Sequence, residues 1–288
     1  MAASHRDWTA RIQNALFRTA LGVAAALPYR LRVPFMGWLV STVVAPLAGW
    51  RRRVAENLAL VRPGMTPAEI ARFQRAVTDN AGRTLIENFS AEEMLARAGS
   101  TEITGPGLPA LEAAREAGRP VITATAHFGN YEAARAALRH RGFEIGGLYR
   151  RLSNPRFNTY YEKRMAPFGQ PFLPQGRRGT AAFIRALKEG RMMGILFDIY
   201  VQEAPEIPFL GQPTRTAVSA AEMALKYGAE LIPIFGIRKE DGLSFRVQVE
   251  APIPPSDPET MTRALNACLE RLIDEHPEQW FWIHRRWK

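Results

Sequence analysis

From residue 120 onward the chain alternates between short apolar runs and amphipathic segments, and this alternation restricts the fold more than any other feature. The run Pro120–Ala126 is apolar and β-branched, as expected for a strand buried on both faces. Later strands are expected at Glu144–Tyr149, Arg191–Phe197, Glu230–Gly236 and Ser244–Glu250, and helices at Tyr131–Arg141, Pro155–Ala166, Thr180–Glu189, Ala217–Tyr227 and Pro258–Glu275. Short connections between them predict one α/β domain with a mostly parallel central sheet covered by helices.

Two helices are expected before the first strand. Thr66-Pro67-Ala68-Glu69 is a capping box with proline at the first helical position, so a helix begins there. Apolar residues then recur at helical spacing up to about Leu95. A shorter helix, Leu108–Ala117, follows the break at Gly105-Pro106-Gly107.

The first 60 residues contain long apolar stretches. Ala15–Leu27 is apolar except for Arg18 and Thr19, and Pro34–Trp50 runs for 17 residues without a charge. A membrane-spanning helix needs about 20 apolar residues, and this stretch is shorter. Tryptophans near its ends and the cluster Arg51–Arg53 after it are typical of a membrane interface. We expect residues 1–60 to form a helical membrane-associated segment and residues 61–288 to form the α/β domain. A pair of buried core helices is the alternative.

Composition restricts the partners. The net charge of +10 favours an acidic partner, which can be nucleic acid, anionic lipid or an acidic protein. Zinc-finger spacings and the aromatic blocks of RNA-binding domains do not occur in the sequence, so nucleic acid is not expected. The single cysteine, Cys268, excludes an intrachain disulfide, and CxxC and HExxH motifs do not occur. We therefore expect no metal and no cofactor.

A histidine stands at the predicted carboxyl end of the first strand. His127 and Glu132 form an H-x4-E pattern across the turn into the next helix, and Gly129 permits that turn. Ligands of open α/β sheets bind at the carboxyl ends of strands. A carboxylate that holds one imidazole nitrogen leaves the other free to take a proton from a hydroxyl. The pattern alone is weak, since a structural histidine after a strand is common.

Five blocks in order make the sequence resemble a known family. They are Arg52-Arg53-Val54-Ala55-Glu56-Asn57-Leu58, His127-Phe128-Gly129-Asn130-Tyr131-Glu132, Tyr149-Arg150-Arg151 with Asn154-Pro155 and Arg164, Gly194-Ile195-Leu196-Phe197-Asp198 with Pro208-Phe209-Leu210-Gly211 and Thr216, and Pro277–Lys288. Together they resemble the lipid A late acyltransferases, the lauroyl/myristoyl transferase branch of the lysophospholipid acyltransferase superfamily. The chain departs from that pattern at Ile199-Tyr200, where family members often carry glutamine after the aspartate.

The resemblance implies roles for particular residues. His127 would be the general base and Glu132 the carboxylate that orients it. Arg150, Asn154 and Arg164 would hold the acyl donor or the acceptor head group, since guanidinium groups suit phosphate and carboxylate recognition. The substrate-binding set is completed by Asn130, Asp198 and Thr216; Asp198 would neutralise one of the arginines or cap a turn.

The resemblance also implies the reaction. An acyl chain would pass from an acyl-carrier protein or acyl-CoA to a hydroxyl of a 3-hydroxyacyl lipid such as a lipid A precursor, on the cytoplasmic face of the inner membrane. Glu203 and Glu206 disfavour a phosphate-rich head group, so a lyso-aminolipid or lysophospholipid is the alternative acceptor. A thioesterase or hydrolase using the same pair, and a non-catalytic membrane-surface protein, are the alternatives from other classes.

Overall fold

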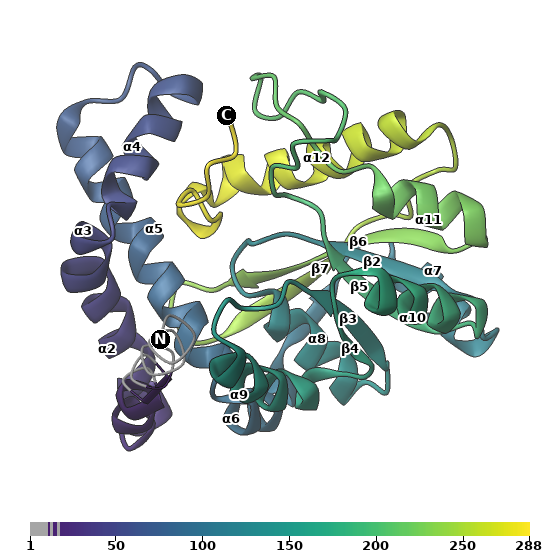
Figure 1. Cartoon of the computed structure of the whole chain (residues 1–288), viewed down its shortest axis with the longest axis horizontal. Coiled ribbons are helices and arrows are strands. Elements are labelled where there is room, and N and C mark those ends of the chain that lie inside the picture. The colour runs from purple at the N-terminus through teal and green to yellow at the C-terminus, as the bar shows by residue number, and fades with distance from the viewer. Residues whose placement is uncertain (1–10, 12–13, 16–17) are drawn as a thin grey trace, which may run out of the picture.

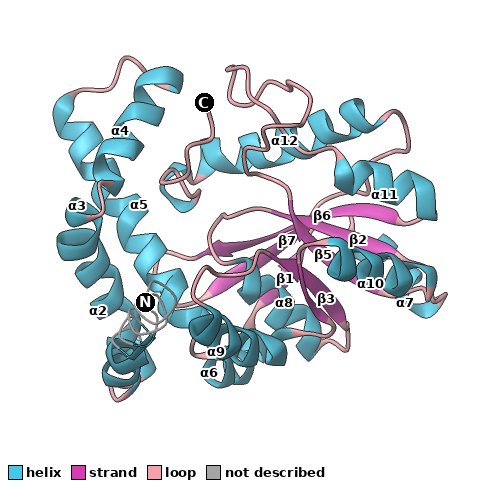
Figure 2. Cartoon of the chain, in the orientation of Figure 1, coloured by secondary structure: helices cyan, strands magenta, loops and turns pink. Residues whose placement is uncertain are grey.

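The fold is built on one twisted sheet. The computed structural model describes Arg11, Asn14, Ala15 and residues 18–288, and in this part of the chain seven strands pair in the order β1-β7-β6-β2-β5-β3-β4 (Figures 1 and 2). The strands are β1 (Glu102–Thr104), β2 (Val121–Thr125), β3 (Ile145–Tyr149), β4 (Phe172–Pro174), β5 (Met192–Leu196), β6 (Glu230–Arg238) and β7 (Phe245–Val249). All neighbours are parallel except β6 and β7.

Helices cover both faces, as expected of a mostly parallel sheet. One face packs against α7 (Leu108–Glu116) and α8 (Tyr131–His140), and the other against α10 (Arg177–Lys188), α11 (Ser219–Tyr227) and α12 (Pro258–Glu275). Strand β2 contributes to both cores because its side chains alternate: Val121 faces the first, while Ile122 and Ala124 face the second. Helices α6 (Ala91–Arg97) and α9 (Pro155–Met165) lie at the edge near β3 and β4 (Figure 1).

Helices α2 to α5 come before the sheet in the chain and lie on one flank of it (Figure 1). They are α2 (Tyr29–Leu39), which continues through a π-helical turn into α3 (Ala45–Leu47), then α4 (Trp50–Val61) and the long α5 (Pro67–Asn88). Helix α2 crosses α5 where two glycines meet. A Cβ on Gly82 would lie 2.5 Å from the Met36 carbonyl oxygen, and one on Gly37 would lie 2.4 Å from Asp79 Oδ1. Only glycine therefore allows this close crossing.

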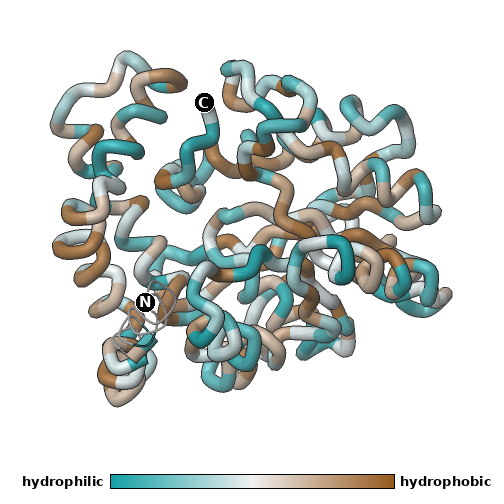
Figure 3. The backbone as a smooth tube through the Cα atoms, in the orientation of Figure 1, coloured by the Kyte–Doolittle hydropathy of each residue, from teal (hydrophilic) through white to brown (hydrophobic). Residues whose placement is uncertain are grey.

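The segment from α2 to α4 has an apolar outer surface. Leu31, Trp38 and Leu47 are exposed to 59%, 55% and 85%, and the tube coloured by hydropathy is largely tan to brown from the end of α2 through α3 (Figure 3). Within the described residues, no single helix has the length and apolarity to cross a bilayer. Tyr29–Leu47 and Trp50–Val61 meet that criterion only as a pair bent by 85°. Of the apolar stretch Ala15–Leu27, residues 16 and 17 lie outside the described part.

The structure confirms the predicted α/β domain with its mostly parallel sheet. Three details differ. The helix expected to reach Leu95 ends at Asn88, because Ser90 starts a separate helix, α6. Helix α10 begins three residues before the expected Thr180. The short strands β1 and β4 were not expected, since three residues are too few to establish a period of two.

Candidate active site

His127 lies immediately beyond the carboxyl end of β2, in the turn that leads into α8. Gly129 shapes this turn: its φ is +50°, and a Cβ there would lie 2.0 Å from the Gly236 carbonyl oxygen. The amide of Asn130 donates to that same oxygen over 2.9 Å. The turn is therefore pressed against β6, and the histidine beside it is held in place.

Asp198 is the carboxylate that contacts the imidazole. Its Oδ1 lies 2.9 Å from His127 Nδ1, and its Oδ2 accepts from the backbone N–H of His127 over 2.9 Å. The indole Nε1 of Trp280 donates to Oδ2 over 3.0 Å. Asp198 follows β5, the strand paired with β2, so the two residues meet at the same edge of the sheet. The aspartate is almost fully buried, whereas 34% of the His127 side chain stays accessible.

This contact sets the charge states of both residues. Burial alone would lower the pKa of His127, but the charge of Asp198 and its hydrogen bond prevail and raise that pKa above its ordinary value. Burial would raise the pKa of Asp198, but the pairing with His127 and the bond from Trp280 hold that pKa below its ordinary value. Asp198 is therefore ionised at neutral pH, and it favours the imidazole tautomer that carries its proton on Nδ1.

Glu132, expected to orient His127, has another partner. Its two carboxylate oxygens accept from Arg135 Nη1 over 3.0 and 2.8 Å, and both side chains are buried. Arg135 Nη2 donates to the carbonyls of Ile145 and Gly169 over 3.0 and 3.1 Å. The pair thus joins α8 to β3 and to the loop before β4. Burial raises the pKa of Glu132, and the pairing with Arg135 opposes that rise.

Asn130 is fully buried and links two parts of the site. Its Oδ1 caps α8 by accepting from the amides of Glu132 and Ala133, and its Nδ2 donates to Glu87 Oε2 over 2.9 Å. Glu87 on α5 is also buried and forms an ion pair with Arg238 of β6. The beginning of α8 is therefore tied to α5 through a fully buried polar network.

The C-terminal segment encloses the site. The amide of Phe281 donates to the His127 carbonyl over 2.9 Å, and the amide of Gly129 donates to the Gln279 carbonyl over 2.9 Å. His284 Nε2 accepts from the Tyr200 amide over 3.0 Å. Burial lowers the pKa of His284 to about 4, so this ring is neutral and can act as an acceptor. Nothing in the sequence indicated that Trp280 and His284 contact the site, apart from their position in the last of the five sequence blocks.

An apolar cavity of about 260 Å³ opens beside His127. Its walls come from α5, from the turn after β2, from Trp50 and from the C-terminal segment; they include Val77, Ala81, Leu85, Phe89, Tyr131, Trp280 and Phe281. The rings of Tyr131 and Phe281 lie 5.9 Å from the imidazole. A histidine that is held through Nδ1 by an aspartate at the edge of an apolar cavity suits proton transfer on a substrate with a hydrocarbon chain.

The remaining predicted residues lie elsewhere on the fold. Arg150 is exposed directly after β3, and Asn154 caps α9 through its Oδ1. Arg164 packs its guanidinium 5.3 Å from the centre of the Tyr160 ring on the same helix. Thr216 is buried and accepts a hydrogen bond from Arg286, so it anchors the C-terminal segment. Asn130, Asp198 and His127 are thus brought together, whereas Arg150, Asn154 and Arg164 are placed on the β3–α9 side.

Comparisons with known proteins identify the family. Residues 4–288 match the model of the bacterial lipid A biosynthesis acyltransferases. The chain is 26% identical over 247 residues to the lipid A biosynthesis lauroyltransferase of Escherichia coli K12, covering 82% of this chain and 78% of that protein. It is 25% identical over 281 residues to the myristoyltransferase of the same organism, covering 91% and 84%.

A relative with a different named acceptor is equally similar. The phosphatidylinositol mannoside acyltransferase of Mycobacterium tuberculosis (strain CDC 1551 / Oshkosh) is 25% identical over 246 residues, covering 83% of this chain and 78% of the relative. The match of the family model over nearly the whole length, together with these relatives, shows that the chain is an acyltransferase and belongs to the bacterial lipid A biosynthesis acyltransferase family.

Proposed function

We propose that the protein transfers a fatty acyl group from an acyl thioester to a hydroxyl of a lipid A precursor or related glycolipid, at a membrane surface. The observation that carries this proposal is the contact between His127 and Asp198 at the edge of an apolar cavity. The acyltransferase family supplies the reaction class, and the relatives' named products supply the class of acceptor.

The proposed chemistry uses His127 as general base. With Nδ1–H donating to Asp198, Nε2 is left to take the proton from the acceptor hydroxyl. The hydroxyl oxygen attacks the thioester carbonyl and forms the new C–O bond. The C–S bond then breaks, and the imidazolium returns its proton to the departing thiolate. The ionised Asp198 stabilises the imidazolium between these two steps, as a buried carboxylate does in other histidine-dependent acyl transfers.

In this proposal Glu132 acts on the site through the backbone. Its buried pair with Arg135 holds α8 against β3, and Asn130 fixes the first turn of the same helix. Both residues are therefore positioning residues. Arg150, Asn154 and Arg164 stay predictions as contacts of the donor or the head group, with guanidinium groups suited to a phosphate.

The apolar cavity beside His127 is the proposed site of the acyl chain. It is formed largely by aliphatic and aromatic side chains of α5 and of the C-terminal segment, which give an alkyl chain favourable burial. Ala81 is the smallest side chain that α5 contributes to its wall. A larger side chain at that position would shorten the space available to the chain.

The donor and the location are inferred from charge and surface. A net charge of +10 suits an acidic acyl-carrier protein, although acyl-CoA carries the same thioester. The exposed apolar side chains of α2 and α3, followed by Arg51, Arg52 and Arg53, suit an interface with anionic lipid. We therefore place the enzyme on the cytoplasmic face of the inner membrane, with α2–α4 against the lipid.

The test is a comparison of total lipid extracts by mass spectrometry from a strain that lacks the gene. The native protein is expected to restore a species heavier than its precursor by one acyl group, and His127→Ala is not. His140→Ala, which changes the exposed histidine at the other end of α8, is the matched control and should behave as the native protein. Identical extracts from native and His127→Ala cells would refute the proposal. The precursor's head group separates lipid A from an aminolipid or lysophospholipid.

A further inference from the structure

Four exposed arginines lie together at the carboxyl edge of the sheet. Arg150 and Arg151 follow β3 directly, and Arg177 and Arg178 follow β4 by three and four residues. The two strands are parallel with Tyr149 opposite Pro174, and the Gln175 amide donates to the Tyr149 carbonyl over 2.7 Å. Both arginine pairs therefore emerge from adjacent strand ends. We call these four residues the arginine edge.

Two residues of the arginine edge lower the stability of α10, the helix on which they lie. Arg177 and Arg178 occupy the first turn of α10, which has no acidic residue there and no side-chain cap. The positive end of the helix dipole repels cations at this position, so both arginines destabilise the start of the helix. Residues that lower the stability of the helix they lie on are typical of a binding surface.

A groove of about 730 Å³ begins beside the arginine edge, passes the ends of β3 and β5, and continues between α10 and α11. Gln175 and Gly176 line one end, and Leu196, Phe197 and Ile199 line the part next to Asp198. Three strand spacings separate β4 from β2, a distance of roughly 14 Å at about 4.8 Å per strand. The groove thus extends from the arginine edge toward the catalytic pair.

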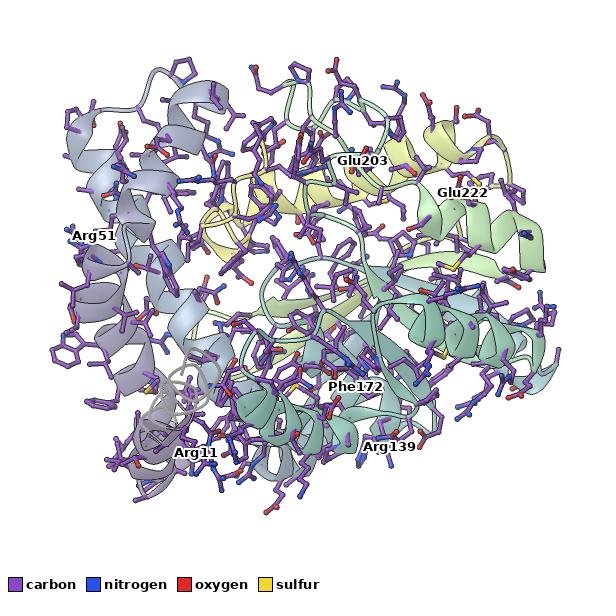
Figure 4. The ribbon with its side chains drawn as sticks, in the orientation of Figure 1. Arg11, Arg51, Arg139, Phe172, Glu203 and Glu222 are labelled. Carbon is purple, nitrogen blue, oxygen red and sulfur yellow. The ribbon has the colours of Figure 1, made fainter. Side chains whose placement is uncertain are left out.

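The groove has mixed chemistry. Its walls are mostly apolar, and Gln175, Thr180 and Ser219 add hydrogen-bonding groups. From α11, Glu222 (labelled in Figure 4) and Lys226 also line it, and their opposite charges cancel. This composition fits a slender ligand that carries both amide and aliphatic groups. The excess positive charge is left to the arginine edge.

The position of the arginine edge favours a soluble partner over a bilayer. Helix α10 lies at the far end of the molecule from α2, α3 and α4, whose exposed apolar side chains are the proposed lipid contact (Figure 1). With α2–α4 against the membrane, the α10 half of the arginine edge lies away from the proposed lipid contact, whereas α9, which follows Arg150 and Arg151, packs against α2. Large opposite charges accelerate the encounter of two soluble proteins.

We propose that the arginine edge is the docking surface for an acidic acyl-carrier protein, whose thioester-bearing arm lies in the groove with the thioester carbonyl at His127. The inference rests on the proposed function and adds the position of the donor. Arg150 and Arg151 flank the entrance from β3, and Arg177 and Arg178 flank it from α10.

The test measures two donors with the purified full-length protein in lipid–detergent micelles at low ionic strength. One donor is an acyl-carrier protein charged with a fatty acid, and the other is the same acyl group on N-acetylcysteamine, which offers no protein surface. The variant is Arg177→Glu/Arg178→Glu, in which acidic residues suit the helix N-terminus and preserve folding. The matched control is Arg141→Glu/Arg185→Glu, which changes two exposed arginines at the opposite, amino edge of the sheet.

For the variant, kcat/KM with the carrier-protein donor is expected to fall about 30-fold, while the control changes less than about threefold. In the variant, kcat/KM with the N-acetylcysteamine donor should stay at the native value. The ratio of kcat/KM between the two donors should therefore also fall about 30-fold. Equal losses with both donors, or equal losses in variant and control, would overturn the docking surface. Loss of sedimentation with anionic vesicles while the carrier-protein rate is kept would assign the arginines to lipid instead.

Binding of the unacylated carrier protein, measured by fluorescence anisotropy, separates this inference from the proposed reaction. If the native protein binds the carrier protein and Arg177→Glu/Arg178→Glu does not, the docking surface is supported. This holds even if no acyl transfer is detected. If acyl transfer occurs with both donors and the variant still binds the carrier as the native protein does, the docking surface is refuted and the proposed function stands.

Discussion

Asp198 Oδ1 lies 2.9 Å from His127 Nδ1, although 71 positions separate the two residues in the chain. Adjacent parallel strands, β2 and β5, end side by side and deliver one residue each. The structure thus assigns the imidazole a carboxylate from a neighbouring strand, while the glutamate of the H-x4-E pattern pairs within its own helix.

The pH dependence of activity follows from this pair. The base must be neutral to accept a proton, and the pKa of His127 is raised above its ordinary 6.5. We expect kcat/KM to increase with pH, with the midpoint of the ascending limb above 6.5. In Asp198→Asn the carboxylate's charge is gone and burial remains, so the midpoint should move below that of the native enzyme and the rate should fall by roughly 100-fold or more. An unmoved midpoint would contradict the pairing.

Glu132→Gln is expected to act on stability more than on the pH profile. The substitution leaves Arg135 buried without its counter-charge, which costs about 3 kcal/mol or more in the free energy of unfolding. Urea unfolding of the variant measures this loss. The ascending limb of kcat/KM should keep its midpoint, and Glu132→Gln/Arg135→Met should recover part of the stability. A shift of the limb equal to that of Asp198→Asn would instead give Glu132 the orienting role.

How much of this site could be foreseen differs from residue to residue. The strand that ends before His127 and the turn at Gly129 are local patterns, so the sequence was sufficient to locate them. The partner of His127 depends on β2 pairing with β5, and strand order is decided by packing across the whole sheet. Arg135, three residues after Glu132, was the available local sign that this glutamate has a helical ion-pair partner. The roles of Trp280 and His284 depend on contacts with residues far away in the chain, which local sequence patterns cannot predict.

The width of the apolar cavity should control acyl length. Ala81→Leu adds three carbon atoms to the cavity wall, and each methylene that can no longer be buried costs about 0.8 kcal/mol. We expect kcat/KM for the longest accepted acyl donor to fall tenfold or more, while donors shorter by four carbons keep most of their rate. Competition between donors of mixed length measures this directly. Ala76→Leu, five residues earlier on α5 and beside a separate groove lined by charged residues, should leave the preference unchanged.

The apolar surface of α2 and α3 predicts lipid binding. Leu47 is exposed to 85%, and replacing it with glutamate removes about 2 kcal/mol of apolar burial on contact with lipid. Leu47→Glu should weaken co-sedimentation with anionic vesicles by about tenfold or more. Leu225→Glu, at an exposed leucine of α11 on the other side of the protein, is the matched control. Equal binding by both variants would place the lipid contact elsewhere.

The C-terminal segment also connects the apolar helices to the catalytic pair. Asn57 of α4 donates through Nδ2 to the carbonyls of Trp282 and His284 over 2.7 and 2.8 Å, and Trp280 in the same segment donates to Asp198. On the proposed orientation, these bonds hold the imidazole at a constant height above the lipid surface. The enzyme then selects its acceptor partly by depth: a hydroxyl is acylated when its own anchoring in the bilayer brings it to that level.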